Sequence, residues 1–518
     1  MNTKTVSITV WSKTGILLIL PLALSSFTHL LNPAGFPDIF YDEGVYLRRA
    51  MHVLEGMGPQ ETATYYDHPF FGQLLLAGIF KLINFPGSIG EGQTDIQTIE
   101  LLYTIPRLVM GALAVLDTYL IFKIANKTYG RKVAIIASIL FAVMPLTWIT
   151  RRIVLDSLLL PFLLMSILFA LNSTSAVGTR RYRWVSLSGI SLSLAIFTKI
   201  PVFTMMPLVA HLLTRTDPGD ERIRNIPDRF KVLAIWLIPV ILIPFLWPLE
   251  SILSGNFDAW MRTVFWQTQR GDRILGLPWI TWAWALIDPV LLLLSIAGGF
   301  MALIKKNWLV LLWSLPYIAF LALIGQTNYF HWAPLLPVFC ISSALALTEG
   351  LPKILTQIKL PRILSPLAVL SILVFGLAST ILVISTDVSI SQRQALAYTL
   401  EILKHQNLDE EQTTAISNPS HAWILKYIYH LGGGLDDYRD VIFYPIKTDD
   451  WILIADGHFR IDMQGEPMLA DIYSRSKLIT TFSNHAPQEG EFAAYPFTSL
   501  LLTTDASNIE FRSGTEED

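Results

Sequence analysis

The chain has 518 residues, of which 52% are hydrophobic and only 15% are charged, and its mean hydropathy is +0.48. Soluble domains carry about 25% charged residues, so this composition excludes an ordinary soluble protein and indicates a membrane protein. The net charge is -3 and no basic stripe is present, which excludes nucleic acid as an expected partner.

Apolar segments that are long enough to cross a bilayer recur along most of the chain. A spanning helix needs about 20 mostly apolar residues. About eleven segments fit, and they are centred near Leu20, Ala114, Leu140, Leu163, Leu192, Pro207, Ile238, Leu293, Phe320, Ala344 and Leu373. The connecting segments rich in Lys and Arg all fall on one side, so the positive-inside rule makes that side, with the N-terminus, cytoplasmic.

The sequence therefore predicts a mostly α fold in two parts. A multi-pass helix bundle in the cell membrane occupies residues 1–385, and a small α/β domain outside the cytoplasm occupies residues 386–518. In this second part, HAWILKYIYHLGGG is typical of a helix that ends at glycine. The stretches DVIFYP and DWILIA are typical of short strands.

The first loop outside the cytoplasm, residues 32–100, is long for a connection and is therefore expected to carry function. The stretch GVYLRRAMHVLEGM predicts a helix lying flat in the membrane interface. The stretch PFFGQLLLAGIFKLI is apolar all round but too short to span, which predicts a second interfacial or re-entrant helix. Pro69 suits the first position of that helix.

Two pairs of polar residues would then lie at the outer membrane surface. Asp42 and Glu43 directly precede the first loop helix, and Asp67 and His68 flank the N-terminus of the second. A helix N-terminus favours anions. The alternative is that these acids form only the solvated face of a loop.

Several ionisable residues fall at the outer ends of the predicted spans: Arg107, Arg151, Arg152, Asp156 and Lys199. Such residues are costly in a membrane and indicate a functional site by default. Arg152 and Asp156 are four residues apart and would share a helix face, either as a capping ion pair or as part of the site. For the other three, the alternative is snorkelling to the interface. Together with the loop acids, these cations would surround an anionic lipid headgroup.

The motifs YDEGVY, YDHPFFGQLL, PRLVMGAL and RRIVLDSLLLPF, in this order, resemble the GT-C class of membrane glycosyltransferases. Within that class they are most similar to the protein O-mannosyltransferase and aminoarabinose (lipid A) transferase group. The resemblance implies a sugar donor carried on a polyprenyl phosphate, with inversion at the sugar. Phe70 and Gln73 depart from the mannosyltransferase pattern, and Asp67 and His68 depart from the aminoarabinose pattern, which leaves the sugar and the acceptor open.

The resemblance also implies roles for individual residues. A carboxylate within reach of the acceptor hydroxyl takes or orients its proton, and cations stabilise the charge that develops on the leaving phosphate. The predicted catalytic residues are Asp42 and Glu43. The predicted ligands of the donor phosphate are Arg107, Arg151, Arg152, Lys199 and Arg270. The predicted supporting residues are Tyr41, Asp67, His68, Asp156 and Tyr329.

Alternatives remain open at this point. Asp67, His68 and His331 are candidate ligands of a divalent metal, although His331 beside Trp332 equally suits an interfacial anchor. The predicted function is a polyprenyl-phosphate-sugar-dependent glycosyltransferase acting on a lipid, glycan or protein acceptor among membrane lipids. The rival is a transporter or flippase for a lipid-linked sugar. That rival is less favoured, because transporters place their site near the midplane of two repeated halves.

Overall fold

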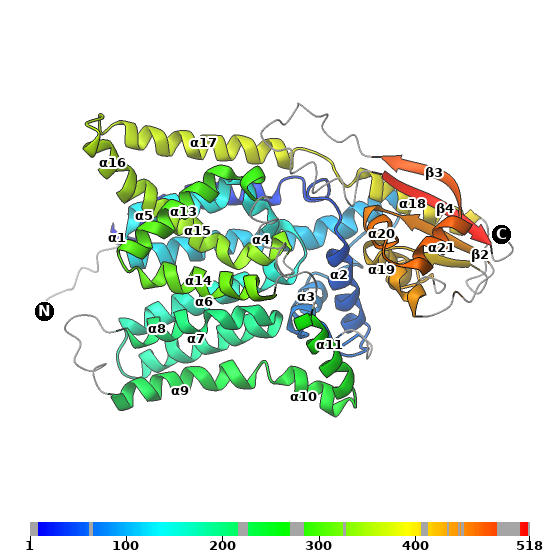
Figure 1. Ribbon diagram of the computed structural model, residues 1–518, viewed down its shortest axis with the longest axis horizontal. Coiled ribbons are helices and arrows are strands. Elements are labelled where there is room, and N and C mark those ends of the chain that lie inside the picture. The colour runs from blue at the N-terminus through cyan, green and yellow to red at the C-terminus, as the bar shows by residue number, and fades with distance from the viewer. Residues whose placement is uncertain are drawn as a thin grey trace, which may run out of the picture.

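The computed structural model describes residues 9–61, 66–215, 226–269, 284–324, 328–405, 413–431, 435–443, 446, 450–483 and 508–515. Long helices run side by side and form one bundle (Figure 1). They are α1 (Thr9–Leu30), α4 (Asp95–Tyr129), α5 (Arg131–Val143), α6 (Leu155–Thr174), α7 (Thr179–Thr198), α8 (Met206–Thr214), α9 (Ile226–Leu242), α13 (Pro289–Ile304), α14 (Trp308–Ile324), α15 (Leu336–Leu345) and α17 (Leu364–Ile384).

Each of the eleven predicted centres lies in one of these helices. Five helices of the described chain are long and apolar enough to cross a membrane, or up to seven if each bent pair is one span. The predicted number of about eleven spans is therefore not confirmed. Several of the remaining helices are apolar but short, such as α8.

Short turns and short helices interrupt the bundle. Figure 1 shows α11 near the end from which the C-terminal domain projects, which we call the domain end, and α16 at the opposite end. The turns and short helices of the bundle are η1 (Pro145–Arg151), η2 (Ile200–Met205), α10 (Leu246–Leu253), α11 (Phe257–Gln269), η4 (Tyr329–Leu335), η5 (Ala346–Gly350) and α16 (Leu351–Gln357). The axis bends by 70° between α5 and η1. Because of these breaks, Arg151, Arg152 and Lys199 lie in irregular backbone and not on continuous helices.

The two helices predicted in the first loop are confirmed as α2 (Tyr41–Leu54) and α3 (Phe71–Leu82). In α2, the side chain of Glu43 reaches back to the backbone N–H of Phe40, a bond of 3.0 Å that fixes where the helix begins. The second helix begins two residues after Pro69. Both helices lie between the bundle and the C-terminal domain (Figure 1).

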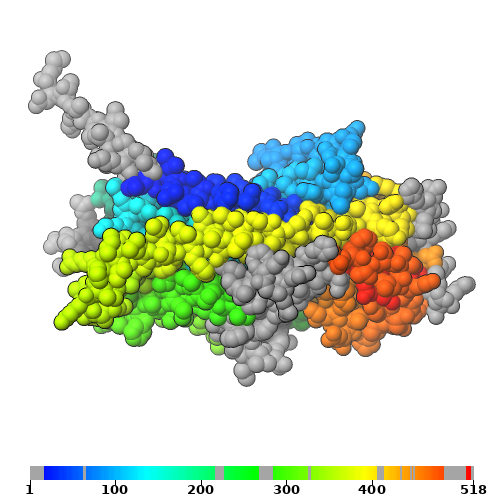
Figure 2. Space-filling view, turned by 90° about the horizontal axis from the view of Figure 1, so that it is seen from above, coloured from blue at the N-terminus to red at the C-terminus, as the bar shows by residue number. Residues whose placement is uncertain are grey.

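The C-terminal domain contains a four-stranded sheet with the strand order β1-β2-β4-β3. Strands β1 and β2 are parallel, and β4 is antiparallel to both β2 and β3. Its elements are α18 (Ile390–His405), β1 (Thr413–Ile416), α19 (Pro419–Tyr427), η6 (Tyr438–Ile442), β2 (Asp450–Ala455), α20 (Gly457–Asp462), α21 (Pro467–Arg475), β3 (Lys477–Ser483) and β4 (Asn508–Thr515). In Figure 2, α17 and then α18 run along one face of the molecule from the bundle to this domain.

The predicted helix in HAWILKYIYHLGGG and the predicted strand DWILIA are confirmed as α19 and β2, but α19 ends at Tyr427 and not at the predicted glycine. The predicted strand DVIFYP is wrong, because Tyr438–Ile442 forms the 3-10 turn η6. Asp437 and Asp440 cap this turn, and Asp437 accepts a hydrogen bond from the N–H of Arg439 at 3.0 Å. These side-chain caps outweigh the strand preference of the valine and isoleucine that follow.

The C-terminal domain is seated on α2 at Gly44. A Cβ atom at Gly44 would lie 2.2 Å from the backbone N of Ser420, at the start of α19. We expect Gly44→Ala to displace the domain from α2 and to lower the melting temperature by several degrees, which can be measured by thermal unfolding in detergent. Gly78→Ala in α3 is the matched control, since nothing lies within 4 Å of its Cβ position. Equal melting temperatures for the two variants would contradict this close contact.

Candidate active site

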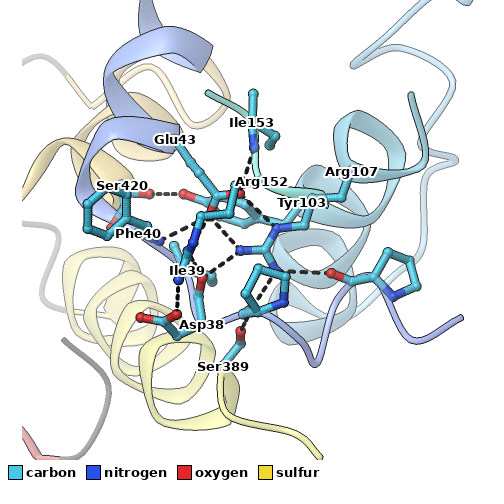
Figure 3. Close-up of polar contacts among 12 residues, drawn as sticks. Asp38, Ile39, Phe40, Glu43, Tyr103, Arg107, Arg152, Ile153, Ser389 and Ser420 are labelled. Carbon is cyan, nitrogen blue, oxygen red and sulfur yellow. Dashed lines mark hydrogen bonds and ion pairs between the residues drawn. The ribbon is translucent and has the colours of Figure 1, made fainter. Parts of the chain in front are cut away.

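Glu43 and Arg107 form a buried ion pair at the domain end of the bundle (Figure 3). The guanidinium of Arg107 donates two parallel hydrogen bonds to the Glu43 carboxylate, of 3.0 Å from Nε and 2.5 Å from Nη2. Glu43 also accepts from the backbone N–H of Ile153 at 3.0 Å. Burial by itself would raise the pKa of Glu43, but the charge and hydrogen bonds of Arg107 outweigh it, so the pKa is lowered. Glu43 is therefore a structural anion.

Arg107 uses its remaining N–H groups to hold the start of the first loop. Nη1 donates to the carbonyl oxygens of Pro33 and Pro37 at 2.9 and 2.7 Å, and Nη2 donates to that of Asp38 at 2.8 Å. All five guanidinium N–H groups thus have partners within the protein. These contacts occupy Arg107, which was predicted to bind the donor phosphate. They also occupy Glu43, which was predicted to be catalytic.

Arg152 belongs to the same cluster (Figure 3). It donates to the Asp38 carbonyl at 2.7 Å and forms an ion pair with the Asp38 carboxylate. Its guanidinium also lies 4.9 Å from the ring centre of Phe40 and 5.7 Å from that of Tyr329. Of the two alternatives for Arg152 and Asp156, the capping ion pair is not formed, because α6 begins only at Leu155 and Arg152 is extended.

Lys199 takes the place of Arg152 as the partner of Asp156. Its Nζ donates to Asp156 Oδ2 at 2.5 Å and lies 4.9 Å from the ring centre of Phe330. The extended backbone of Lys199 joins α7 to η2, which lets its side chain reach α6. Arg151 donates to the carbonyl of Leu31, and its Nε and Nη1 have no hydrogen-bond partner among the described residues.

Asp42 differs from its neighbour Glu43. The two side chains point about 100° apart on α2, and the structure gives the partly exposed Asp42 carboxylate no hydrogen-bond partner among the described residues. Burial raises the pKa of Asp42, and the charges of Asp67 and Asp156 act in the same direction. The positive charges of Lys199 and His458 oppose this rise. An accessible carboxylate with a raised pKa between cations is suited to general base chemistry.

Asp67 lies near Asp42 but is held by an arginine. Arg49 Nη2 donates to Asp67 Oδ1 at 2.7 Å, and the buried Glu61 joins Arg48 and Arg49 on the other side. Burial would raise the pKa of Asp67, but Arg49 outweighs it and the pKa is lowered. Asp67 is therefore an ionised, paired carboxylate.

The suggested metal site at Asp67, His68 and His331 is not supported. Among the described residues, no three His, Cys, Asp or Glu side chains converge in a way that could hold a metal ion. The carboxylate of Asp67 is taken by Arg49, and Nδ1 of His331 accepts the backbone N–H of Asn328 at 3.0 Å. Arg270, a predicted phosphate ligand, lies outside the described residues.

The two predicted supporting tyrosines both lie at the segment that contains Asp42. Tyr329 packs edge-on against Phe40 at 6.0 Å between ring centres. Tyr41 donates a hydrogen bond from its hydroxyl to Asp437 of the C-terminal domain. His68 lies against the ring of Tyr46, whose hydroxyl interacts with the charge of Asp42.

Sequence reasoning missed Asp38, Tyr46 and three residues of the C-terminal domain: Asp437, Arg439 and His458. Asp38 stands only four residues before Asp42, and this nearness to the acidic pair was a usable signal, whereas its partner Arg152 lies 114 residues away in the chain. The C-terminal residues carried no such signal, because more than 390 residues separate Tyr41 from Asp437. Only the docking of the domain brings them to α2.

Comparison with solved structures shows that the fold is that of the GT-C class of membrane glycosyltransferases, as the sequence motifs predicted. The structure of ArnT from Cupriavidus metallidurans bound to undecaprenyl phosphate matches with a TM-score of 0.54 and 14% identity, over 98% of each chain. The archaeal oligosaccharyltransferase AglB from Archaeoglobus fulgidus, in complex with an inhibitory peptide and a dolichol-phosphate, matches with a TM-score of 0.57 and 13% identity. That match covers 93% of this chain and 74% of AglB.

At the family level, residues 60–253 match the model described as dolichyl-phosphate-mannose-protein mannosyltransferase. No curated protein sequence matches the chain. The family match begins after Asp42 and Glu43 and includes Arg107, Arg152, Asp156 and Lys199.

Proposed function

We propose that this protein is a glycosyltransferase that moves a sugar from a polyprenyl-phosphate-linked donor to an acceptor outside the cytoplasm. The single observation that carries the proposal is the state of Asp42. The other acids around it, Glu43, Asp67 and Asp156, are each neutralised by a cation at 2.7 Å or less. Asp42 alone among these four accepts no hydrogen bond within the described residues, so it is available to a substrate.

The fold and family matches support the chemistry of the donor. The matched structures of ArnT and AglB contain undecaprenyl phosphate and a dolichol-phosphate, and the family model is that of a dolichyl-phosphate-mannose transferase. A polyprenyl phosphate would keep its chain in the membrane and present its sugar at the domain end. The positive-inside pattern of the sequence supports a position of this end outside the cytoplasm.

In the proposed reaction, Asp42 accepts the proton of the acceptor nucleophile while that nucleophile attacks the anomeric carbon. The bond to the phosphate oxygen breaks in the same displacement, and the phosphate leaves with the electron pair. A single displacement inverts the configuration at the anomeric carbon. The leaving phosphate gains negative charge, so a preorganised cation stabilises the transition state more than the bound donor.

We assign Lys199 as the cation nearest to this step. It interacts with the charge of Asp42, and its ammonium has three N–H donors, of which one is used for Asp156. Arg107 has no free N–H group, and Arg152 is held by Asp38. Arg151 is a second candidate, since two of its nitrogen atoms are buried without a partner among the described residues.

Replacement of Lys199 by glutamine is expected to lower kcat by about 100-fold, because the leaving phosphate would lose a positive partner. The measurement is steady-state transfer in proteoliposomes. Lys81→Gln is the control, because Lys81 is an exposed residue of α3 at the same end. A Lys199→Gln variant with the kcat of the wild type would remove Lys199 from the mechanism.

The function itself is tested by offering purified protein in liposomes a panel of radiolabelled polyprenyl-phosphate sugars with an acceptor-rich extract. The expected result is label in a product, together with release of polyprenyl phosphate from one donor. Movement of an intact labelled donor across the bilayer without transfer would instead establish the flippase. Folded protein that does neither with any donor would overturn the proposed function.

A further inference from the structure

The C-terminal domain brings a histidine to the predicted base. His458 lies on α20, with its ring centre 5.7 Å from that of Phe40 and 5.6 Å from that of Tyr41. These two aromatic residues immediately precede Asp42 in the chain. A positive charge on His458 would also favour the ionised form of Asp42, since His458 is one of the two cations that lower the pKa of that carboxyl.

The position of His458 is fixed by a buried polar link within the domain. Asp456 caps α20 by accepting the N–H of Phe459 at 2.9 Å, and it also accepts a hydrogen bond from the side chain of Asn418. Asn418 in turn caps α19 by accepting the N–H of Ser420 at 2.8 Å. Because α19 rests on Gly44 of α2, this link holds α20 at a set distance from the helix that carries Asp42.

A second contact holds the other side of the same segment. The hydroxyl of Tyr41 donates to Asp437 and accepts from Nη1 of Arg439 at 3.2 Å. The guanidinium of Arg439 also lies 4.7 Å from the ring centre of Tyr41. The first turn of α2 is therefore clamped by the C-terminal domain directly beside Asp42.

The charged groups around Asp42 differ in how much of their charge is left to act on it. Lys199 is shared with Asp156 at 2.5 Å, and Asp67 is shared with Arg49 at 2.7 Å. These pairings reduce the effect of both charges, but Lys199 still lowers the pKa of Asp42 more than His458 does. Tyr46 is neutral at ordinary pH because its pKa is raised. His458 is the second cation that acts on Asp42, and it is the one that the C-terminal domain supplies.

We propose that His458 is a positioning residue of the transfer reaction, which keeps Asp42 ionised and oriented, so that the C-terminal domain completes the active site. This inference rests on the proposed function and deepens it. The C-terminal domain would then be part of the reaction centre. The bundle would supply the donor side of the site, and the domain would control the carboxylate on the acceptor side.

The test is the pH dependence of kcat/KM for the full-length protein in liposomes, with the donor found active in the panel. A base must be ionised, so activity is lost as the pH falls through the pKa of Asp42. Loss of a nearby positive charge raises that pKa. In His458→Asn, the acid limb, which is the low-pH side of the profile of kcat/KM against pH, is therefore expected to move to higher pH. On that limb kcat/KM is expected to fall about tenfold.

The variant His458→Lys keeps a positive charge at every pH of the measurement and is expected to move the acid limb back to the wild-type position or below it. His430→Asn is the matched control. His430 is an exposed histidine of the same domain with a φ of 53°, which asparagine tolerates. This control is expected to show the profile of the wild type.

The possible outcomes separate the two proposals. The inference is supported if the acid limb moves to higher pH in His458→Asn and lies at or below the wild-type position in His458→Lys. A limb that stays in place in both, or an equal loss of rate in both without displacement, overturns it, because a merely structural histidine would act in that way. Absence of transfer by the wild type would overturn the proposed function, and this inference with it.

Discussion

Replacement of Asp42 by asparagine is expected to lower the rate of sugar transfer by about 10²- to 10⁴-fold, the usual contribution of a general base. The amide keeps the size of the carboxylate but cannot accept the nucleophile's proton. The fold should survive, because Asp42 makes no hydrogen bond among the described residues, so the melting temperature in detergent should stay within about 2 °C of the wild type.

The matched control is Glu55→Gln, which removes an exposed carboxylate at the C-terminal end of the same helix. The measurement is transfer of labelled sugar in proteoliposomes, with polyprenyl phosphate release followed in parallel. If Asp42→Asn transferred sugar at the rate of this control, the base would have to be sought elsewhere. Asp156 would be the next candidate, since its Oδ1 is buried without a partner among the described residues.

Replacement of Arg107 by methionine is expected to destabilise the protein by about 3–5 kcal/mol. The change leaves Glu43 as a buried charge without its main partner, and it removes the donors from the carbonyl oxygens of Pro33, Pro37 and Asp38. A loop that loses these contacts no longer holds Asp42, so activity should fall together with stability. The measurement is the melting temperature in detergent, alongside the donor KM.

Two comparisons sharpen this prediction. Glu349→Gln breaks the exposed pair of Glu349 with Lys305 and is expected to cost less than about 1 kcal/mol. Addition of Glu43→Gln to Arg107→Met is expected to cost less than the sum of the two single changes, because the unpaired buried charge is then gone. An Arg107→Met variant with normal stability but a raised KM for the donor would contradict this structural role. It would instead support the role predicted from the sequence, in which Arg107 binds the donor phosphate.

Much of the domain end could be predicted from local sequence. The helix of GVYLRRAMHVLEGM and the apolar helix after Pro69 were both predictable, because periodicity and length act within a few residues. Asp42 stood out for the same local reason, as an acid at the start of an amphipathic helix. The failed strand DVIFYP shows the limit of such patterns. In that stretch, capping by two aspartates set the backbone conformation, and the hydrophobic residues did not form a strand.

The pairing of charges was not predictable, since it depends on which side chains meet in three dimensions. Spacing alone favoured Arg152 with Asp156, but the break before α6 separated them and gave Arg152 to Asp38 and Lys199 to Asp156. The same assembly turned Glu43 toward Arg107 and left Asp42 open.

Composition and periodicity were enough to predict the membrane character, the two loop helices and the acids near their ends, because these signals act over short stretches of the chain. Three-dimensional packing settled which acid is left without a partner among the described residues, which cations are already paired, and that His458 lies against Phe40 and Tyr41, which precede Asp42. A hydrogen bond forms over about 3 Å in space, whereas these partners lie tens to hundreds of residues apart in the chain.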